Sequence, residues 1–521
     1  MNLVKDKWIP VKRADGTPDT IAPWEIGATN NPVVDITAPR PDFRGALYQF
    51  LIGLVQTAFA PEDDDEWEEK WKKVPECEEL RMAFEKFSDA FELDPESGSA
   101  FMQDKSITEL EELPIEDIIG GALSSNTREK NKDLFTKSGT VKNISPYWAA
   151  LALFNVQTSG VPAWGQHRVG LRLVGPVTTL LQPDDNVLFF HCIWANVLTI
   201  EDMISVPGDK NKIKMKDIFP WVGKIRYSPN KEKTIPADAH PLQHYWALPR
   251  RIKIITQKND TVCDITGELL TFSVSNYRRQ VDGTFYSDGW IHPLSPYESR
   301  HNRQFPSVIT GDKLKDGYSF WLPLTLGIGN FYAAKVVAKY NEQRYLYFKS
   351  RLWAFGYEAE SANTKAWHES IMPLVYISDR NKHVDFIDIV RKIIGGAVST
   401  AEILLETVKI AWFGEKTKTR RHPKGDYSFI SAAFWSETES AFYSTAEKLR
   451  SALESDQPTA PVLSEWRTII ISAAEKIFDR YALNATDEPR NMKRIALAAK
   501  ALSAILNSKK TKSINALKEA A

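Results

Sequence analysis

The chain of 521 residues contains only three cysteines, Cys77, Cys192 and Cys263, and no two of them form a CxxC pair. This spacing excludes a disulfide framework and a cysteine-rich zinc site. Few and isolated cysteines are typical of a reducing compartment, so the sequence predicts a cytoplasmic protein. The chain also lacks an apolar run near the roughly 20 residues of a membrane span, and its start has no signal-peptide pattern. We therefore expect no membrane contact.

The chain also has no excess of positive or negative residues, because its formal net charge is −1. A nucleic-acid site must therefore be a local basic patch, or one that basic partner subunits complete. The shares of hydrophobic residues (43%) and charged residues (26%) are ordinary for a globular protein. At roughly 100–200 residues per domain, the length predicts about two to four domains.

Known catalytic patterns are absent: there is no Walker A sequence, no GxGxxG after a strand, no GxSxG elbow and no HExxH. The carboxylates Asp63, Asp64 and Asp65 are consecutive and stand where a helix is expected to begin. That position favours compensation of the helix dipole on a solvated face over metal binding. His292, within WIHPLSP, is expected to be packed and hydrogen-bonded. The sequence thus predicts a binding protein without catalytic residues, a metal site or a cofactor.

The chain changes character near residue 373. Before it, a hairpin turn at Asp15-Gly16, helical periodicity and a β-meander over 261–297 predict a mixed α/β domain. After it, four long amphipathic segments with polar connections predict an antiparallel four-helix bundle. We therefore expect an α+β protein with domains at 1–373 and 374–521.

A basic loop over 124–142 and the segment downstream of it are the strongest candidates for a binding site. The cations of the loop are Arg128, Lys130, Lys132, Lys137 and Lys142. The downstream segment, WGQHRVGLR, contains Trp164, Gln166, His167, Arg168 and Arg172. Exposed cations, hydrogen-bonding side chains and glycines that permit close backbone approach suit a nucleic-acid ligand. The alternative is a solvated surface loop before a buried strand.

Three further basic features follow. Arg278 and Arg279 are guanidinium groups that suit phosphates or base edges, unless one of them is an ordinary solvent-facing strand residue. The first connection of the bundle carries Lys416, Lys418, Arg420, Arg421 and Lys424, which predict phosphate contacts or a solvated loop. The tail after Leu506 carries Lys509, Lys510, Lys512 and Lys518, and we expect it to fray.

Six motifs follow one another along most of the chain. They are NLVKDKWIPV at 2–11, FMQDK at 101–105, ALFNVQTSG at 152–160, GPVTTLL at 175–181, WIHPLSPY at 290–297 and GYEAESANTKAW at 356–367. In this order, and in a chain of this length, they resemble the family of large subunits (CasA) of Cascade, the type I-E CRISPR surveillance complex. The resemblance implies a mixed α/β domain of unusual topology that carries a carboxy-terminal four-helix bundle.

The same resemblance implies a non-enzymatic function in antiviral defence. A subunit of this family contacts other Cascade subunits and the 5′ handle of the crRNA. It examines duplex DNA for a short protospacer-adjacent motif (PAM), helps to open the duplex and offers a platform to a helicase–nuclease. The protein then reads a short motif, while pairing with the guide RNA reads the remaining sequence.

Two site segments are carried over by position from this resemblance. The loop that meets the crRNA 5′ handle and a neighbouring subunit falls on about 126–142. The glycine loop that faces the PAM falls on Trp164–Arg168, where its glycine run is reduced to Gly165. Side chains of Gln166, His167 or Arg168 are therefore expected to contact DNA in place of the backbone.

Two more site segments are carried over by position from the same resemblance. The tip of the strand-separating wedge falls on Glu360, Ser361 and Ala362, and Lys365 is the basic residue that follows it. The minor-groove lysine of the family aligns near Val281, so Arg278 or Arg279 is the expected substitute. The bundle cations Lys416, Lys418, Arg420 and Arg421 are expected to hold DNA without sequence preference.

Two other functions stay open on the sequence alone. One is a metal-dependent nuclease that uses scattered carboxylates and histidines. The other is a structural scaffold that binds protein partners and no DNA, because basic clusters also suit acidic proteins or crRNA.

Overall fold

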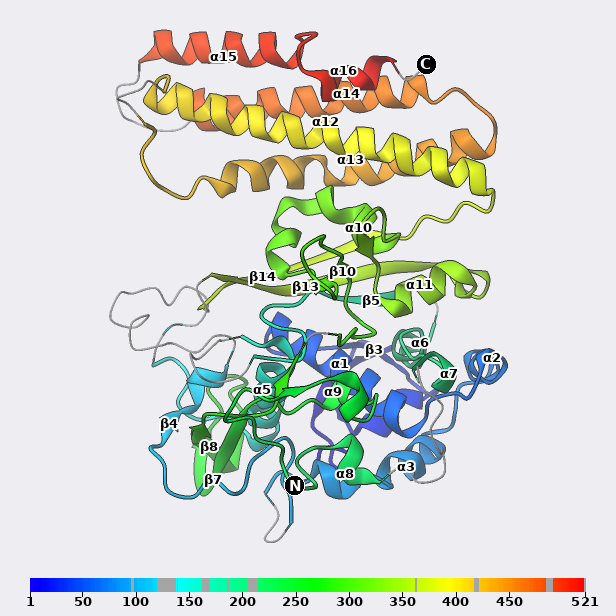
Figure 1. The fold of residues 1–521 in the computed structure, drawn as a ribbon, viewed down its shortest axis with the longest axis vertical. Coiled ribbons are helices and arrows are strands. Elements are labelled where there is room, and N and C mark those ends of the chain that lie inside the picture. Colours follow the sequence, from blue (N-terminus) through cyan, green and yellow to red (C-terminus); the bar gives the residue numbers. More distant parts are fainter. Residues whose placement is uncertain are drawn as a thin grey trace. The chain divides into compact units, whose positions relative to one another are not determined.

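The computed structural model describes residues 1–94, 98–119, 137, 139–161, 169–184, 187–203, 214–287, 289–360, 363–416, 421–483 and 491–519 (Figure 1). The chain forms two compact units. Unit 1 comprises residues 1–312 and 329–369, and unit 2 comprises residues 313–328 and 370–521. The segment 313–328 thus belongs to the mainly helical unit, although it precedes the predicted domain boundary.

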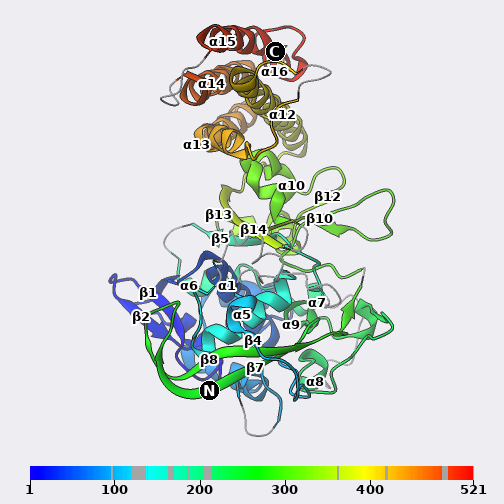
Figure 2. The same cartoon turned by 90° about the vertical axis from the view of Figure 1, so that its left-hand side faces the viewer.

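Unit 1 begins with a small antiparallel sheet of the order β2-β1-β3, which is visible in Figure 2. Its strands are β1 (Ile9–Arg13), β2 (Pro18–Ile21) and β3 (Val33–Ile36). Gly16 has a φ of 87°, a left-handed conformation that glycine adopts without steric cost. The predicted hairpin turn at Asp15-Gly16 is confirmed.

The core of unit 1 surrounds helix α1 (Pro41–Ala58), which is buried along most of its length. Phe50 of α1 makes edge-to-face contacts with Phe91, Phe101 and Trp246, at centroid distances of 5.9, 6.1 and 6.0 Å. Helix α5 (Pro146–Ser159) packs against α1 and is also buried on nearly every side. Of these two helices, α5 leads toward the predicted PAM-facing segment at 164–168.

Shorter helices and strands complete unit 1. The helices are α2 (Asp64–Lys72), α3 (Cys77–Glu85), α6 (Phe189–Trp194), α7 (Ile200–Met203), α8 (Met215–Ile218), α9 (Gln243–Trp246) and α11 (Lys335–Glu342). A small antiparallel sheet contains β10 (Tyr297–Glu298), β11 (Ser307–Val308) and β12 (Phe331–Tyr332).

The predicted meander over 261–297 is only partly correct. Strands β7 (Arg251–Val262) and β8 (Leu269–Gln280) form a long antiparallel hairpin, to which β4 (Leu113–Pro114) adds an edge. After β8 the chain leaves this sheet. Strand β9 (Phe285–Tyr286) instead pairs in parallel with β6 (Lys233–Thr234). A non-local pairing of this kind has no signature in local turn chemistry.

A further sheet, of the order β14-β13-β5, carries the predicted wedge. Its strands are β5 (Thr178–Pro183), β13 (Ser350–Glu360) and β14 (Asn363–Pro373). The central strand β13 is antiparallel to β5, with Leu352 opposite Leu181.

Unit 2 contains the four long helices that the sequence predicts, which confirms the α+β class with a carboxy-terminal bundle. They are α12 (Arg380–Phe413), α13 (Ser428–Glu454), α14 (Ala460–Phe478) and α15 (Met492–Leu506), with a π-helical turn at Asp479–Leu483. Figure 2 views them close to end-on. The short helix α10 (Trp321–Thr325) supplies Trp321 to the same core. Within the described ranges, no helix is long and apolar enough to span a membrane.

The expectation of a frayed tail is wrong. Residues Lys512–Glu519 form helix α16, which packs on α12 and α14. Ile514 and Leu517 are buried, and a Cβ atom on Gly396 of α12 would lie 2.8 Å from Leu517 Cδ1. Glycine at this position of α12 therefore makes room for the apolar side of α16. The tail lysines stand on an ordered helix and its connection.

Candidate nucleic-acid interface

The predicted PAM-facing residues Trp164, Gly165, Gln166, His167 and Arg168 lie outside the described residues, but both ends of their segment are described. Helix α5 ends at Gly160, which has a φ of 67°. A Cβ atom there would lie 1.8 Å from Leu173 O, so only glycine permits this approach. On the other side, a Cβ atom on Gly170 would lie 3.2 Å from Gly160 N. The two described ends of the segment therefore lie side by side.

Two buried arginines, Arg172 and Arg250, support the two ends of this segment. The burial of Arg172 contradicts the expectation that it is an exposed cation. The Arg172 guanidinium donates to Gln49 Oε1 at 2.7 Å, to Thr178 Oγ1 at 2.9 Å and to Ser295 Oγ at 3.1 Å. Burial lowers the pKa of Arg172 to about 10. Arg250 Nη2 donates to Gly160 O at 2.7 Å, and burial lowers its pKa to about 9. Both side chains stay charged at neutral pH and support the ends of the segment.

Two histidines, the half-buried His244 and the buried His292, lie near Arg172. The expectation of a packed, hydrogen-bonded His292 is confirmed, since it is 3% exposed and its Nδ1 accepts from Leu294 N at 3.1 Å. The His244 ring centroid lies 6.1 Å from that of His292. Burial is the main cause that lowers both pKa values, to about 4 for His244 and well below the usual value for His292.

These histidines predict acid-sensitive stability. In the unfolded chain a histidine takes up its proton near pH 6.5, whereas folded His244 does so only near pH 4. The unfolded state binds more protons between these values, so the free energy of unfolding should fall as the pH is lowered from 6.5 to 4. The contribution of His244 is at most about 3 kcal/mol. Denaturant titrations at pH 7.5 and 5.0 should show a weaker pH dependence for the double variant His244→Gln/His292→Asn. The exposed control His301→Gln should retain the wild-type dependence; an equal effect of both would contradict the assignment.

The predicted wedge lies at the end of the β13–β14 hairpin. Ser361 and Ala362 are outside the described residues, while Glu360 and Lys365 flank them and form an ion pair. This pairing offsets the repulsion that Glu360 would exert on a phosphate backbone. Further down the hairpin, His368 Nε2 lies 2.8 Å from Glu358 Oε2. Two successive side-chain pairs, each between β13 and β14, thus connect the strands of the hairpin behind its tip.

The base of this hairpin is anchored in the core of unit 1. The Tyr357 hydroxyl donates to Asp42 Oδ2 at 2.6 Å and accepts from Asn155 Nδ2 at 2.7 Å. Asp42 is fully buried and makes a bidentate contact with Arg40, with both distances 3.0 Å. Burial, followed by the charge of Asp42, raises the pKa of Tyr357. Asn155 belongs to α5, so one buried cluster joins the strand that leads to the predicted wedge and the helix that leads to the predicted PAM-facing segment.

The candidates Arg278 and Arg279 do not act as a pair. Successive strand residues point to opposite faces, and these two lie opposite Lys253 and Ile252 of β7. Arg278 donates to Thr108 O at 2.5 Å and forms an ion pair with Glu112 at 2.7 Å. On the other face, the charge of Arg279 contributes to the lowered pKa of Arg250. Contact of Arg278 with DNA would require it to leave Glu112.

Within the predicted crRNA loop, Arg128, Lys130 and Lys132 lie outside the described residues, whereas Lys137 and Lys142 are described. The backbone N–H groups of Lys142 and Asn143 both donate to Asp264 Oδ2 at 2.7 Å. Asp264 lies in the turn between β7 and β8. The carboxyl end of the loop is therefore fixed to the end of this hairpin.

The bundle connection forms a basic hollow of about 490 Å³ on unit 2. It is lined by Lys409, Lys416, Arg421, His422, Pro423, Lys424, Gly425 and Tyr427. Lys416 pairs with Glu406 at 2.7 Å, while Arg421 and Lys424 are exposed and form no ion pair within the described parts of the chain. The other two predicted residues, Lys418 and Arg420, lie outside the described residues.

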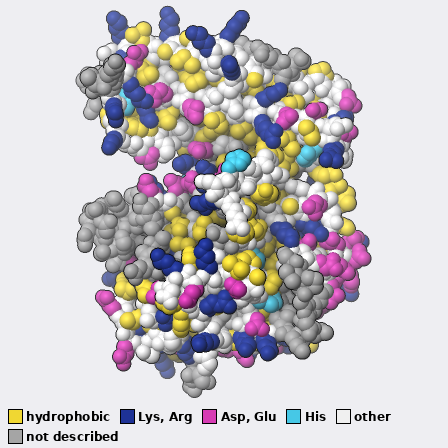
Figure 3. All heavy atoms as spheres, in the orientation of Figure 1, with side chains coloured by type: hydrophobic (Ala, Val, Ile, Leu, Met, Phe, Trp, Pro, Cys, Tyr) yellow, Lys and Arg dark blue, Asp and Glu magenta, His cyan; other side chains and the backbone are white. Residues whose placement is uncertain are grey.

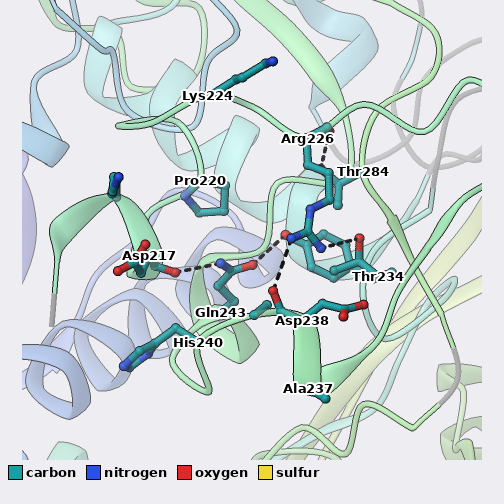
Figure 4. A pocket seen from close by; sticks show the side chains of 13 residues that line it. Asp217, Pro220, Lys224, Arg226, Thr234, Ala237, Asp238, His240, Gln243 and Thr284 are labelled. Carbon is teal, nitrogen blue, oxygen red and sulfur yellow. Dashed lines mark hydrogen bonds between the residues drawn. The ribbon is translucent and has the colours of Figure 1, made fainter. Parts of the chain in front are cut away.

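A polar pocket of about 390 Å³ in unit 1 was not foreseen from the sequence (Figure 4). Arg226 donates to Thr234 Oγ1 and to Asp238 O, both at 3.2 Å, and Gln243 Nε2 donates to Asp217 O at 2.7 Å. Carboxylates of Asp217 and Asp238 share this pocket with its cations. Because the two signs alternate, the pocket lacks the uniform positive charge that a phosphate backbone requires.

The acidic run stands at the start of α2, as expected for residues that compensate the helix dipole. Asp63 is the N-cap residue and accepts from Glu66 N at 2.9 Å. Asp64 pairs with Lys339 of α11 at 2.9 Å. In the part of the chain that the structure describes, no group of three or more His, Cys, Asp or Glu side chains is arranged to hold a metal ion.

Comparison with known proteins agrees with this architecture. The chain is similar to CasA (Cse1) from Thermus thermophilus, with 15% identity over 97% of this chain and 99% of that one, and a TM-score of 0.65. It is similar to Cse1 from Acidimicrobium ferrooxidans, with 14% identity over 99% of both chains and a TM-score of 0.65. A chain of a CRISPR RNA-guided surveillance complex matches with 14% identity over 98% of this chain and 99% of that one, and a TM-score of 0.63. The model of the family "CRISPR-associated protein Cse1" matches residues 2–477. The chain therefore belongs to the Cse1 family, and its resemblance to the large subunit of type I-E Cascade is confirmed.

Proposed function

We propose that this protein is a non-enzymatic subunit that reads the PAM in duplex DNA and helps to separate its strands for guide pairing. In this role it acts in the cytoplasm with other Cascade subunits and the crRNA 5′ handle, and it recruits a helicase–nuclease to the opened target. Similarity to a chain of an RNA-guided surveillance complex supports crRNA and fellow subunits as partners.

The observation that carries the proposal is the buried Asn155–Tyr357–Asp42 cluster. Its hydrogen bonds of 2.7 and 2.6 Å connect α5, five residues before Gly160, to β13, four residues before Ser361. The chain beyond Gly160 also contacts β13, because a Cβ atom on Gly175 would lie 2.5 Å from Tyr357 O. Segments that are about 200 residues apart in sequence thus extend from one rigid base. Such a base suits the reading of a motif next to the point where a duplex opens.

The energetics of opening are compatible with a small wedge. Separating DNA costs about 1.4 kcal/mol per base-pair step in stacking, which pairing with the guide largely replaces. The wedge at Ser361 and Ala362 therefore needs only to start the opening. Lys365, paired with Glu360, is available to a phosphate after a local exchange of partners.

Binding to a DNA library that is randomised beside the target tests this function. The isolated chain, the crRNA complex without it and the reconstituted assembly are compared in gel shifts. Adding the subunit should create motif-dependent binding, which Arg168→Gln or Ser361→Lys should weaken about tenfold or more, since a base contact is worth roughly 1–3 kcal/mol. The matched control is Arg300→Gln, an exposed arginine of unit 1 that pairs with Glu298.

Two outcomes would reject the proposal. Binding that is unchanged when the subunit is added would favour a scaffold without DNA reading. Metal-dependent cleavage of DNA by the isolated chain, lost when Asp63, Asp64 and Asp65 are replaced, would favour a nuclease.

A further inference from the structure

The outward face of α15 is rich in lysine and has no acidic residue. Ile495, Ala498, Leu502 and Leu506 point into unit 2. At about 3.6 residues per turn, Lys493 and Lys500 lie two turns apart on the opposite face. Lys509, Lys510 and Lys512 continue the series into α16, and all five lysines are exposed. These five residues are called the α15 lysine strip.

The strip differs from the rest of the bundle surface in its lack of carboxylates. No Asp or Glu occurs from Asn491 to Lys518. None of the five lysines forms an ion pair with a described residue, whereas Lys382, Lys448 and Arg450 on α12 and α13 all pair with acids. Figure 3 shows Lys and Arg side chains projecting along the edge where α15 and α16 lie. Charge of one sign on an ordered helix is the electrostatic footprint of a polyanion site.

The strip is continuous with the basic hollow of the bundle connection. Arg494, next to Lys493, donates to Ala411 O at 2.9 Å and to Trp412 O at 2.5 Å. These carbonyls are at the end of α12, immediately before the connection that carries Lys416 and Arg421. The first turn of α15 is therefore fixed beside the hollow, and the remaining lysines lead away from it along the helix.

We propose that the α15 lysine strip binds the phosphate backbone of DNA and extends the bundle connection into one track. Helix α15 has 15 residues, so at about 1.5 Å per residue it is about 22 Å long, or roughly six base pairs of a duplex. The inference rests on the proposed function only in its choice of DNA as the ligand. Lysine acts as a point charge on phosphate, so the track selects no sequence.

The same face also carries Leu497, which is 59% exposed, and the small residues Ala496, Ala501 and Ala504. A protein partner would use such apolar area at the centre of its interface. Lys493 and Lys500 nevertheless share the most outward direction of the helix with Leu497 and Ala504, so cations stand at the centre of this face. Depletion of lysine at the centre of protein interfaces favours DNA as the ligand.

The test replaces the five lysines of the strip by glutamine in the full-length chain. Fluorescence anisotropy with a motif-free 30-base-pair duplex measures the dissociation constant from low to moderate salt. We expect at least tenfold weaker binding at low salt. The slope of log K against log salt should become shallower by about one for each lysine that contacts a phosphate. Helical circular dichroism should be unchanged, since the five side chains are exposed.

A matched control shows whether the position of the removed charges matters or only their number. Arg380, Arg391, Lys392, Lys448 and Lys476 are exposed residues of α12, α13 and α14. Their replacement by glutamine causes the same change in net charge and should leave binding within about twofold, because these cations are spread over a surface that also carries carboxylates, such as the partners of Arg391 and Lys448. Equal losses in the two variants would overturn the proposal. Unchanged DNA binding by the strip variant would also overturn the proposal. The face would then be a protein interface if the variant no longer joins the surveillance complex, and an ordinary solvated surface if it still does. Because the duplex contains no motif and the chain is tested alone, the result does not depend on whether the protein reads a PAM.

Discussion

Replacing Asp42 by alanine should lower the free energy of unfolding by about 3–5 kcal/mol, because it removes one partner from a buried ion pair. The Asp42 side chain is fully buried and holds Arg40 through two contacts of 3.0 Å. Its loss would leave the Arg40 guanidinium, which is 20% exposed, without its carboxylate. It would also remove the acceptor of the Tyr357 hydroxyl. Denaturant titration followed by circular dichroism measures this change.

Two variants show whether the cluster or a general change of charge is responsible. Tyr357→Phe removes only the hydroxyl and should cost about 1–2 kcal/mol, since Asp42 keeps Arg40. Asp388→Ala breaks the exposed pair with Arg391 and should cost less than about 1 kcal/mol. A loss below about 1 kcal/mol for Asp42→Ala would contradict the view that this cluster anchors β13. If the wedge depends on this anchor, Tyr357→Phe should also weaken motif-dependent DNA binding.

Replacing Trp466 by alanine should destabilise unit 2 by about 3–5 kcal/mol, the usual cost of removing a buried aromatic side chain. Trp466 is 0% exposed and lies between Tyr318 and Phe442, with ring centroids 6.0 and 5.9 Å away. Its Nε1 donates to Ile393 O of α12 at 3.1 Å. The side chain therefore connects α14, α13, α12 and the segment before α10.

Far-UV circular dichroism during guanidinium titration should report this loss, because unit 2 is mainly helical. Trp466→Phe keeps most of the ring and should cost about half as much. The control Leu497→Ala truncates a 59% exposed side chain of α15 and should change stability by less than about 0.5 kcal/mol. Equal effects of Trp466→Ala and Leu497→Ala would show that Trp466 is not a central packing residue.

Local patterns predicted much of the fold. The four bundle helices, the hairpin turn at Gly16 and the acidic start of α2 agree with the structure. Each depends on residues a few positions apart, namely an apolar period, a residue with free φ, or an acid at a helix start. The family could likewise be identified from the order of its motifs. The residues of the site were harder to predict, because many of them are set by contacts between distant segments.

Tertiary contacts decided the roles of the cations. Arg172, Arg278 and Arg279 look equivalent in sequence, yet Arg172 is buried among neutral hydrogen-bond partners and Arg278 is paired with Glu112. Lysines of the tail, which local composition predicts to be frayed, stand on an ordered segment because Gly396 lets Leu517 pack on α12.

The sequence by itself determined the helices, the turns and the family, because periodicity and turn chemistry act over a few residues. Only the tertiary structure brought Asn155 beside Tyr357 and left the α15 lysine strip without an ion pair to any described residue. Burial and pairing depend on which distant segments meet, and that is decided by the packing of the whole core.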